Sequence, residues 1–135
     1  MIFVLWANNF DEAAASVFIT ELRDAGLRVQ VVGLHGQQIA GAHGLVLGPD
    51  VRLDEAQRYG EQARCLIIPA PLRCLAPFET DPRLCRFIEE VQTAGARIVA
   101  GDADYDATQL LAAGVEVYPP GEDVFEFARR LARSL

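Results

Sequence analysis

The sequence has 135 residues, is 51% hydrophobic and carries a formal net charge of −7, which is the size and apolar content of one globular domain over residues 1–135. The acidic balance argues against nucleic acid and membranes as partners, because both attract basic proteins. The sequence shows no signal peptide, no apolar segment long enough to cross a bilayer and no CxxC pair among its three cysteines. We therefore expect a cytoplasmic protein without a zinc finger.

The N-terminal part of the chain predicts a βαβ unit. Ile2–Trp6 is a wholly apolar run, which is typical of a strand buried on both faces. A helix follows from about Asp11, where an acidic residue interacts favourably with the helix dipole, and Gly26 ends it. Residues 27–32 return as a second strand, so we expect the two strands to be parallel and their connection right-handed.

Residues 33–59 differ from the rest of the chain because glycine is frequent there. Two short strand-like pieces at residues 38–40 and 45–47 flank a glycine-containing turn at residues 41–44. This pattern predicts a small hairpin that stands off the main sheet. A short helix is expected at residues 53–59.

Strands and helices then alternate to the end of the chain. The strands are expected at residues 64–68, 98–100 and 115–118, and the helices at residues 82–94, 102–113 and 122–135. Residues 69–71, with the sequence Pro-Ala-Pro, should end the third strand. We predict an α/β fold, a flavodoxin-like three-layer sandwich with a five-stranded parallel sheet in the order 2-1-3-4-5 and a small inserted hairpin. The ligand crevice should lie at the C-terminal ends of the strands.

Five short motifs add a family resemblance to this pattern. In chain order they are Asn9-Phe10-Asp11-Glu12, Arg23 with Ala25, Gly26 and Val29, Ala42-His43-Gly44 with Pro49, Asp50 and Leu53, Leu66-Ile67-Ile68-Pro69, and Phe125-Glu126-Phe127-Ala128. Together they resemble the ThiJ/PfpI family of the class I glutamine amidotransferase-like superfamily over nearly the whole chain. The resemblance implies the same fold, and a homodimer that pairs through the first helix and the hairpin.

The sequence departs from the family pattern where the family carries out its chemistry. The resemblance places the family's nucleophilic cysteine at Asp102 and the glutamate that tunes it at Ala14. The Gly-Gly pair that donates N–H groups to an oxyanion falls on Ala70 and Pro71, and proline has no N–H to donate. A long family segment before the last strand is also absent. The resemblance therefore implies a shortened, degenerate member, a pseudoenzyme without cysteine-dependent glyoxalase, deglycase or peptidase activity.

Asp102 is the candidate catalytic residue, and it has two interpretations. As the N-cap of the helix expected at residues 102–113, it would bond backbone N–H groups, and Asp102→Ala would lower stability by about 1 kcal/mol. As a nucleophile or general base it would need a partner, yet His35 and His43 both lie on the hairpin side of the chain. We predict the cap.

The crevice residues are expected to follow the first, third and fourth strands. They are Asn8, Asn9, Asp11, Glu12, Ala70, Cys74, Ala103 and Asp104. Carboxylates gathered at this edge would bind Mg²⁺, but acidic residues are also favoured in the first turn of any helix. We therefore expect no resident metal and no cofactor. Cys74 is a weaker candidate nucleophile that we expect to be inert, as most loop cysteines are.

Two functions of different classes remain. The favoured one is a non-catalytic ThiJ/PfpI-like protein that binds an unidentified small molecule or protein partner. The alternative is a hydrolase or other enzyme that uses Asp102 with Asp11 and Glu12, with or without Mg²⁺. For assembly, the alanines at residues 13–15 indicate a smooth patch on the first helix, which agrees with the homodimer that the resemblance implies.

Overall fold

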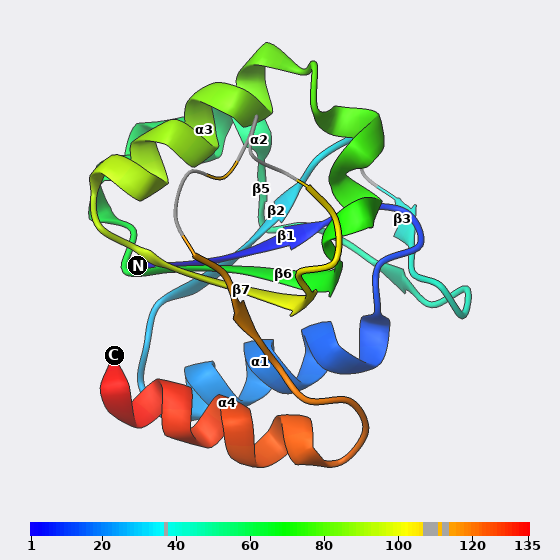
Figure 1. Cartoon of the computed structure of the whole chain (residues 1–135), viewed down its shortest axis with the longest axis vertical. Helices are drawn as coiled ribbons and strands as arrows, with labels where there is room; N and C mark the ends of the chain where they lie inside the picture. Colours follow the sequence, from blue (N-terminus) through cyan, green and yellow to red (C-terminus); the bar gives the residue numbers. More distant parts are fainter. Residues whose placement is uncertain (37, 107–110, 112–113) are drawn as a thin grey trace.

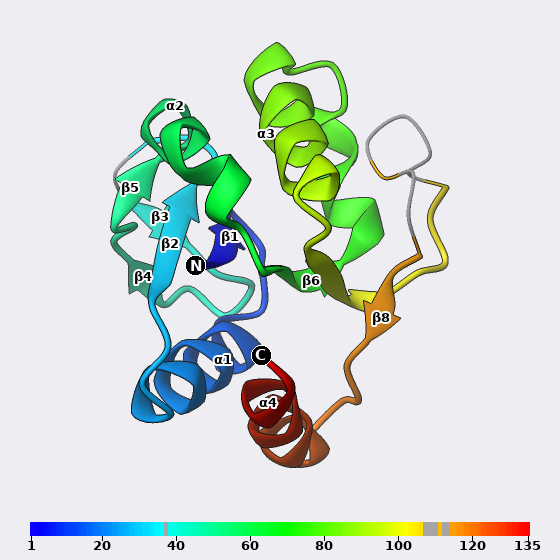
Figure 2. The same ribbon diagram turned by 90° about the vertical axis from the view of Figure 1, so that its left-hand side faces the viewer.

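The computed structural model describes residues 1–36, 38–106, 111 and 114–135 and shows a parallel sheet between two layers of helices (Figure 1). Helices α1 (Glu12–Asp24) and α4 (Asp123–Ser134) cover one face of the sheet, and α2 (Leu53–Ala56) and α3 (Pro82–Thr93) cover the other. Figure 2 shows the two layers on opposite sides of the strands. Within the described residues, no helix has the length and apolar content needed to cross a membrane.

The sheet has six strands, which are all parallel to their neighbours. In spatial order they are β5 (Val51–Arg52), β2 (Val29–Gly33), β1 (Ile2–Trp6), β6 (Cys65–Pro71), β7 (Arg97–Asp102) and β8 (Glu116–Val117). The predicted fold class and the predicted order of five strands are confirmed. Strand β5 adds a sixth strand at the edge, which the sequence did not predict because two residues are too short to show a periodic pattern.

Strand β1 is the centre of the core, and all five of its side chains are buried. Phe3 packs edge-on against Phe87 of α3, with ring centroids 5.1 Å apart. On the opposite face, Ile2 and Val4 join the cluster that contains Phe18 of α1. Successive side chains of a strand point to opposite faces, so this apolar run requires helices on both sides of the sheet.

The antiparallel hairpin of β3 (Ile39–Ala40) and β4 (Val46–Leu47) is confirmed, and a buried carboxylate fixes it to α1. Glu12 accepts hydrogen bonds from the backbone N–H groups of His43 at 2.9 Å and Leu45 at 3.2 Å, and its Oε1 lies 2.8 Å from Nδ1 of His43. A side chain at Gly41 would collide with this carboxylate, so the close approach requires glycine. Glu12 and these three hairpin residues are called the hairpin clamp below.

Arg23 and Asp50, which belong to two of the sequence motifs, meet beside β2. The Nη2 atom of Arg23 lies 2.7 Å from Oδ2 of Asp50, which also accepts the backbone N–H of Val31 at 2.8 Å. Arg23 also donates to the carbonyl of Val29 at 2.9 Å. This ion pair therefore satisfies two backbone groups of β2, the carbonyl of Val29 and the N–H of Val31.

Strand β6 corrects the prediction that residues 69–71 end the third strand. The strand continues to Pro71, and its pairing with β7 shifts register between Ile68 and Pro71. Proline cannot donate to a sheet ladder, and a bulge is one of the few places within a sheet that tolerates it. The carbonyl of Pro69 instead accepts the backbone N–H of Asp11 at 2.8 Å, which attaches the start of α1 to this strand.

The helix predicted at residues 102–113 is wrong in the part that the structure describes. Asp102 ends β7, and residues 103–106 and 111 are not helical. Residues 107–110 and 112–113 of this prediction lie outside the described residues. The hydroxyl of Tyr105 donates a hydrogen bond to the carboxylate of Glu79. This bond connects the segment after β7 to a residue 26 positions earlier in the chain.

Two segments form 3₁₀ helices that the sequence did not predict. The helix expected at residues 53–59 divides into α2 and the 3₁₀ helix η1 (Gln57–Gln62). A second 3₁₀ helix, η2 (Leu72–Phe78), occupies the segment expected to be a loop after the third strand. It contains Pro77 and lacks the length and spacing of an amphipathic helix, so periodicity alone could not reveal it.

We expect Glu12→Gln to loosen the hairpin. Burial of the Glu12 carboxyl raises its pKa, but hydrogen bonds from the His43 side chain and from the backbone N–H groups of Glu12, His43 and Leu45 lower it to about 2. The charged carboxylate is therefore the form that the clamp needs. Hydrogen exchange of the Leu45 amide should accelerate in Glu12→Gln, while Glu61→Gln on the exposed η1 should not change it. Unchanged exchange at Leu45 would contradict the clamp.

The clamp should also depend on pH. Because the folded pKa of Glu12 lies below its ordinary 4.5, its contribution is present above that value and is lost as the pH falls towards about 2. The bond to Glu12 raises the pKa of His43 above its ordinary 6.5, so the ion-pair contribution is present below 6.5 and is lost as the pH rises through the raised value. Hairpin protection should therefore be greatest between about pH 4.5 and 6.5.

Candidate functional site

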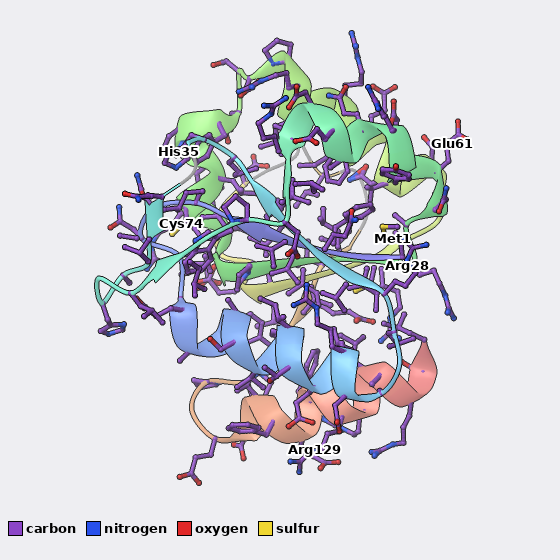
Figure 3. The ribbon with its side chains drawn as sticks, turned by 180° about the vertical axis from the view of Figure 1, so that it is seen from behind. Met1, Arg28, His35, Glu61, Cys74 and Arg129 are labelled. Carbon is purple, nitrogen blue, oxygen red and sulfur yellow. The ribbon has the colours of Figure 1, made fainter. Side chains whose placement is uncertain are left out.

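The C-terminal ends of the parallel strands meet the loops at one edge of the sheet, where ligands of such sheets bind. Asp102 ends β7 at this edge and pairs in register with Pro71 at the end of β6. In the view from behind, Cys74 and His35 lie at this end of the sheet, and Met1 and Arg28 lie at the opposite end (Figure 3). The edge is thus formed by the ends of β6 and β7, η2 and the start of α1.

Asp102 forms an ion pair through only one of its two carboxylate oxygens. Its Oδ2 lies 3.2 Å from Nη1 of Arg73 in η2, and the Arg73 side chain is 67% exposed while that of Asp102 is 27% exposed. Its other oxygen, Oδ1, is buried and has no hydrogen-bond partner among the described residues. A buried carboxylate oxygen without a donor is unfavourable, so this atom is the main unsatisfied acceptor of the edge.

The N-cap interpretation of Asp102 is wrong. Asp102 lies in β7 and its carboxylate bonds Arg73, so it accepts no N–H group from a helix that begins at residue 103. The acidic N-caps are instead Asp11, which accepts from the N–H groups of Ala13 and Ala14, and Asp81 at the start of α3. The sequence could not distinguish these roles, because each aspartate follows a turn and precedes an apolar segment.

Cys74 lies close to Asp102 but is not an activated thiol. It is half-buried on η2, where burial raises the pKa of its thiol and the nearby Arg73 opposes this only in part. A nucleophilic cysteine needs a lowered pKa so that thiolate is present. Of the other two cysteines, Cys65 is buried in β6 and Cys85 is half-buried and donates to the carbonyl of Glu79.

The carboxylates of the edge are engaged separately. Asp11 caps α1, Glu12 holds the hairpin clamp and Asp102 bonds Arg73. Within the described residues, no group of three or more His, Cys, Asp or Glu side chains could hold a metal ion. The geometry therefore gives the acidic-enzyme hypothesis no shared site among these three residues.

The remaining crevice residues lie around the same edge without meeting at one point. Asn9 adopts a positive φ of 70° in the turn after β1, a conformation that asparagine tolerates better than most residues. Asn8 accepts the backbone N–H of Ala40 at 3.1 Å, which links this turn to the hairpin. Ala70 is buried inside β6, and Ala103 and Asp104 are exposed after β7.

Neither histidine acts on Asp102 in this structure. His43 belongs to the hairpin clamp, and its ring is 82% exposed. His35 accepts the backbone N–H of Asn8 through Nε2 at 3.2 Å, and its ring lies against Phe78 of η2. Both histidines therefore bond residues other than Asp102, as predicted.

Two residues of this edge escaped prediction, Arg73 and Tyr118. Arg73 reaches Asp102 across 29 positions of sequence from a 3₁₀ helix, so no local pattern indicated it. Tyr118 follows β8 and is only 6% exposed. Burial raises the pKa of its phenol, and the charges of Asp11 and Asp102 raise it further.

Comparison with solved structures shows the same fold. A DJ-1 superfamily protein of Salmonella typhimurium is 21% identical, with a TM-score of 0.72 and coverage of 98% of this chain and 88% of that chain. DJ-1beta of Drosophila melanogaster is 17% identical, with a TM-score of 0.76 and coverage of 99% and 89%. Oxidized DJ-1 of Toxoplasma gondii is 18% identical, with a TM-score of 0.72 and coverage of 98% and 94%.

Similarities at this level of identity establish the fold and leave the activity open. No protein of curated function matches the sequence. The DJ-1/PfpI family model matches residues 1–103, which run from the start of β1 to just beyond Asp102 at the end of β7. With most of its length matched, and with this fold, the chain belongs to the DJ-1/PfpI family.

Proposed function

We propose that this chain is a non-catalytic member of its family that binds a small molecule or a protein partner at the C-terminal edge of the sheet. The observation that supports this most directly is the buried, unpartnered Oδ1 of Asp102. An unsatisfied buried acceptor destabilises a fold by about 1–3 kcal/mol. A ligand or partner that brings an N–H or O–H donor would remove that penalty, so the edge favours donors.

The same edge is poorly suited to cysteine chemistry. The resemblance places the family's nucleophile at Asp102, and the nearest thiol, Cys74, has a pKa that burial raises. Pro71 pairs with Asp102 in the sheet and has no N–H to stabilise an oxyanion. These features support a binding role and argue against inherited glyoxalase, deglycase or peptidase activity.

The alternative function, a hydrolase or other enzyme based on Asp102 with Asp11 and Glu12, has less support. Each of the three carboxylates bonds a different part of the fold. The proposal is for a protein of the cytoplasm, as the odd number of free cysteines suggests.

A homodimer is part of the proposal, although the surface differs from the one predicted. Of the three alanines at residues 13–15, Ala14 and Ala15 are buried inside the chain and only Ala13 is exposed. Two exposed apolar side chains, Leu45 and Val46, lie instead on the hairpin, where they are 51% and 54% exposed. These two side chains provide apolar surface for a contact between two copies of the chain. The family resemblance implies that such a contact is made through the first helix and the hairpin.

We expect light scattering at micromolar concentration to give twice the mass of one chain. Val46→Glu places a charge in the proposed contact and should shift the mass to that of a monomer, because an unpaired charge is unfavourable in an interface. Val117→Glu, an exposed valine at the far edge of the sheet, is the matched control and should leave the mass unchanged. A monomeric wild-type protein would refute the dimer.

Asp102→Ala should leave stability unchanged or raise it by about 1–2 kcal/mol. The substitution removes an exposed ion pair worth about 0–1 kcal/mol and also removes the unsatisfied Oδ1. Asp81→Ala, which deletes a true N-cap, should lower stability by about 1 kcal/mol. Urea unfolding at an unchanged m-value measures both. A loss of stability in Asp102→Ala as large as that in Asp81→Ala would remove the main support for a binding edge.

A thermal-shift screen of metabolites and divalent metals tests the function. A compound that binds only the folded state raises Tm, and it should do so less in Asp102→Asn, which keeps the shape of the side chain but not its charge. The binding proposal predicts a hydrogen-bond donor among the hits. A Tm increase from Mg²⁺ that Asp102→Asn abolishes would instead favour the enzyme. No hit in the screen would contradict both the enzyme and a small-molecule ligand, and would reduce the binding proposal to a protein partner.

A further inference from the structure

A groove of about 280 Å³ lies between the first turn of α1 and the loop that leads into α4. Figure 1 shows this loop, in orange, beside the start of α1. Most of the groove wall is apolar. The apolar residues that line it are Ala13, Ala14 and Val17 of α1, Pro119 and Pro120 of the loop, and Val124 and Phe125 of α4.

Two polar side chains, those of Tyr118 and Asp11, line the groove. Tyr118 lines it and is 6% exposed, and its hydroxyl has no hydrogen bond to any described residue. This hydroxyl lies over Gly101, where an added Cβ would come within 2.9 Å of it. Asp11 also lines the groove, and its charge raises the pKa of the Tyr118 phenol. Its Oδ1 caps α1, while Oδ2 makes no hydrogen bond within the described part of the chain.

The charge of the groove is negative. Among the residues that the structure describes, its ionisable lining residues besides Tyr118 are the carboxylates Asp11 and Glu122, and none of them is basic. The N-termini of α1 and α4 both lie here, and each contributes about half a positive charge. Two full negative charges outweigh them, so a cation is favoured and an anion is not. The guanidinium carbon of Arg129 lies 6.0 Å from the centroid of the Phe125 ring, and the Arg129 side chain pairs with Glu21.

We propose that this groove binds a small ligand that has an ammonium group on a compact apolar body. The ammonium group lies between Oδ2 of Asp11 and the Tyr118 hydroxyl, both of which can accept its N–H bonds. The apolar body packs against Pro120, Val17 and Phe125. The inference rests on the proposed binding function and names the chemical class of the ligand. The groove is a different site from Asp102, which does not line it. The unpartnered oxygen of Asp102 could accept a hydrogen bond from any donor.

The test uses three probes of similar shape and different charge. 2-Phenylethylamine at about ten times its Kd should raise Tm by about 4 °C. The neutral 2-phenylethanol and the anionic 3-phenylpropanoate should give little or no shift. If 2-phenylethanol raises Tm as much as the amine does, the groove recognises apolar area alone and the proposal is overturned.

Two variants locate the bound ammonium group. Asp11→Asn keeps the N-cap, because asparagine caps about as well as aspartate, but removes the charge. It should weaken 2-phenylethylamine binding, measured by calorimetry, about tenfold or more. Tyr118→Phe should weaken it less, through loss of one acceptor. Asp24→Asn, at the exposed C-terminal end of α1, is the control and should bind as the wild type does.

The outcomes separate this inference from the proposed function. Amine binding that Asp11→Asn leaves unchanged, or no amine binding at millimolar concentration, overturns the groove. A screen hit that Asp102→Asn abolishes would keep the proposed function even when the amine fails to bind and the groove is overturned. If neither the screen nor the amine gives a shift, the groove and the small-molecule form of the proposed function both fail.

Discussion

Ile2–Trp6 contains no charged side chain, and a strand sends successive side chains to opposite faces, so both faces of the sheet at β1 must be removed from water. The chain meets this requirement with helices on each side: Phe3 packs on α3, while Ile2 and Val4 pack on the side of α1 and α4. Parallel strands in such a sandwich bring the ends of β6 and β7 to one edge. The position of the candidate site thus follows from the burial of one strand.

Long apolar strands and amphipathic helices could be predicted because their signals are local. The stripe Leu84, Phe87, Ile88 and Val91 predicts α3 without any knowledge of its neighbours. Asp102 shows the limit of this reasoning. Its role depends on Arg73, 29 positions away, and an aspartate after a strand has the same local pattern whether it caps a helix or forms an ion pair.

The family motifs acquire a physical meaning in the structure because their residues meet at long range. Arg23 and Asp50 satisfy two backbone groups of β2, and Glu12 satisfies those of the hairpin turn. In each case a carboxylate accepts backbone N–H groups: Asp50 that of Val31, and Glu12 those of His43 and Leu45. These contacts explain why such motif residues occur together at fixed places along the chain, and sequence alone could show only their order.

Pro71 at the end of β6 removes a backbone N–H donor from the candidate site. A Gly-Gly pair at this edge would present N–H groups and would therefore favour anions. Pro71 has no N–H, and Asp102 opposite it adds a carboxylate. Neither the main chain of Pro71 nor the carboxylate of Asp102 therefore offers a hydrogen-bond donor where the two strands end side by side.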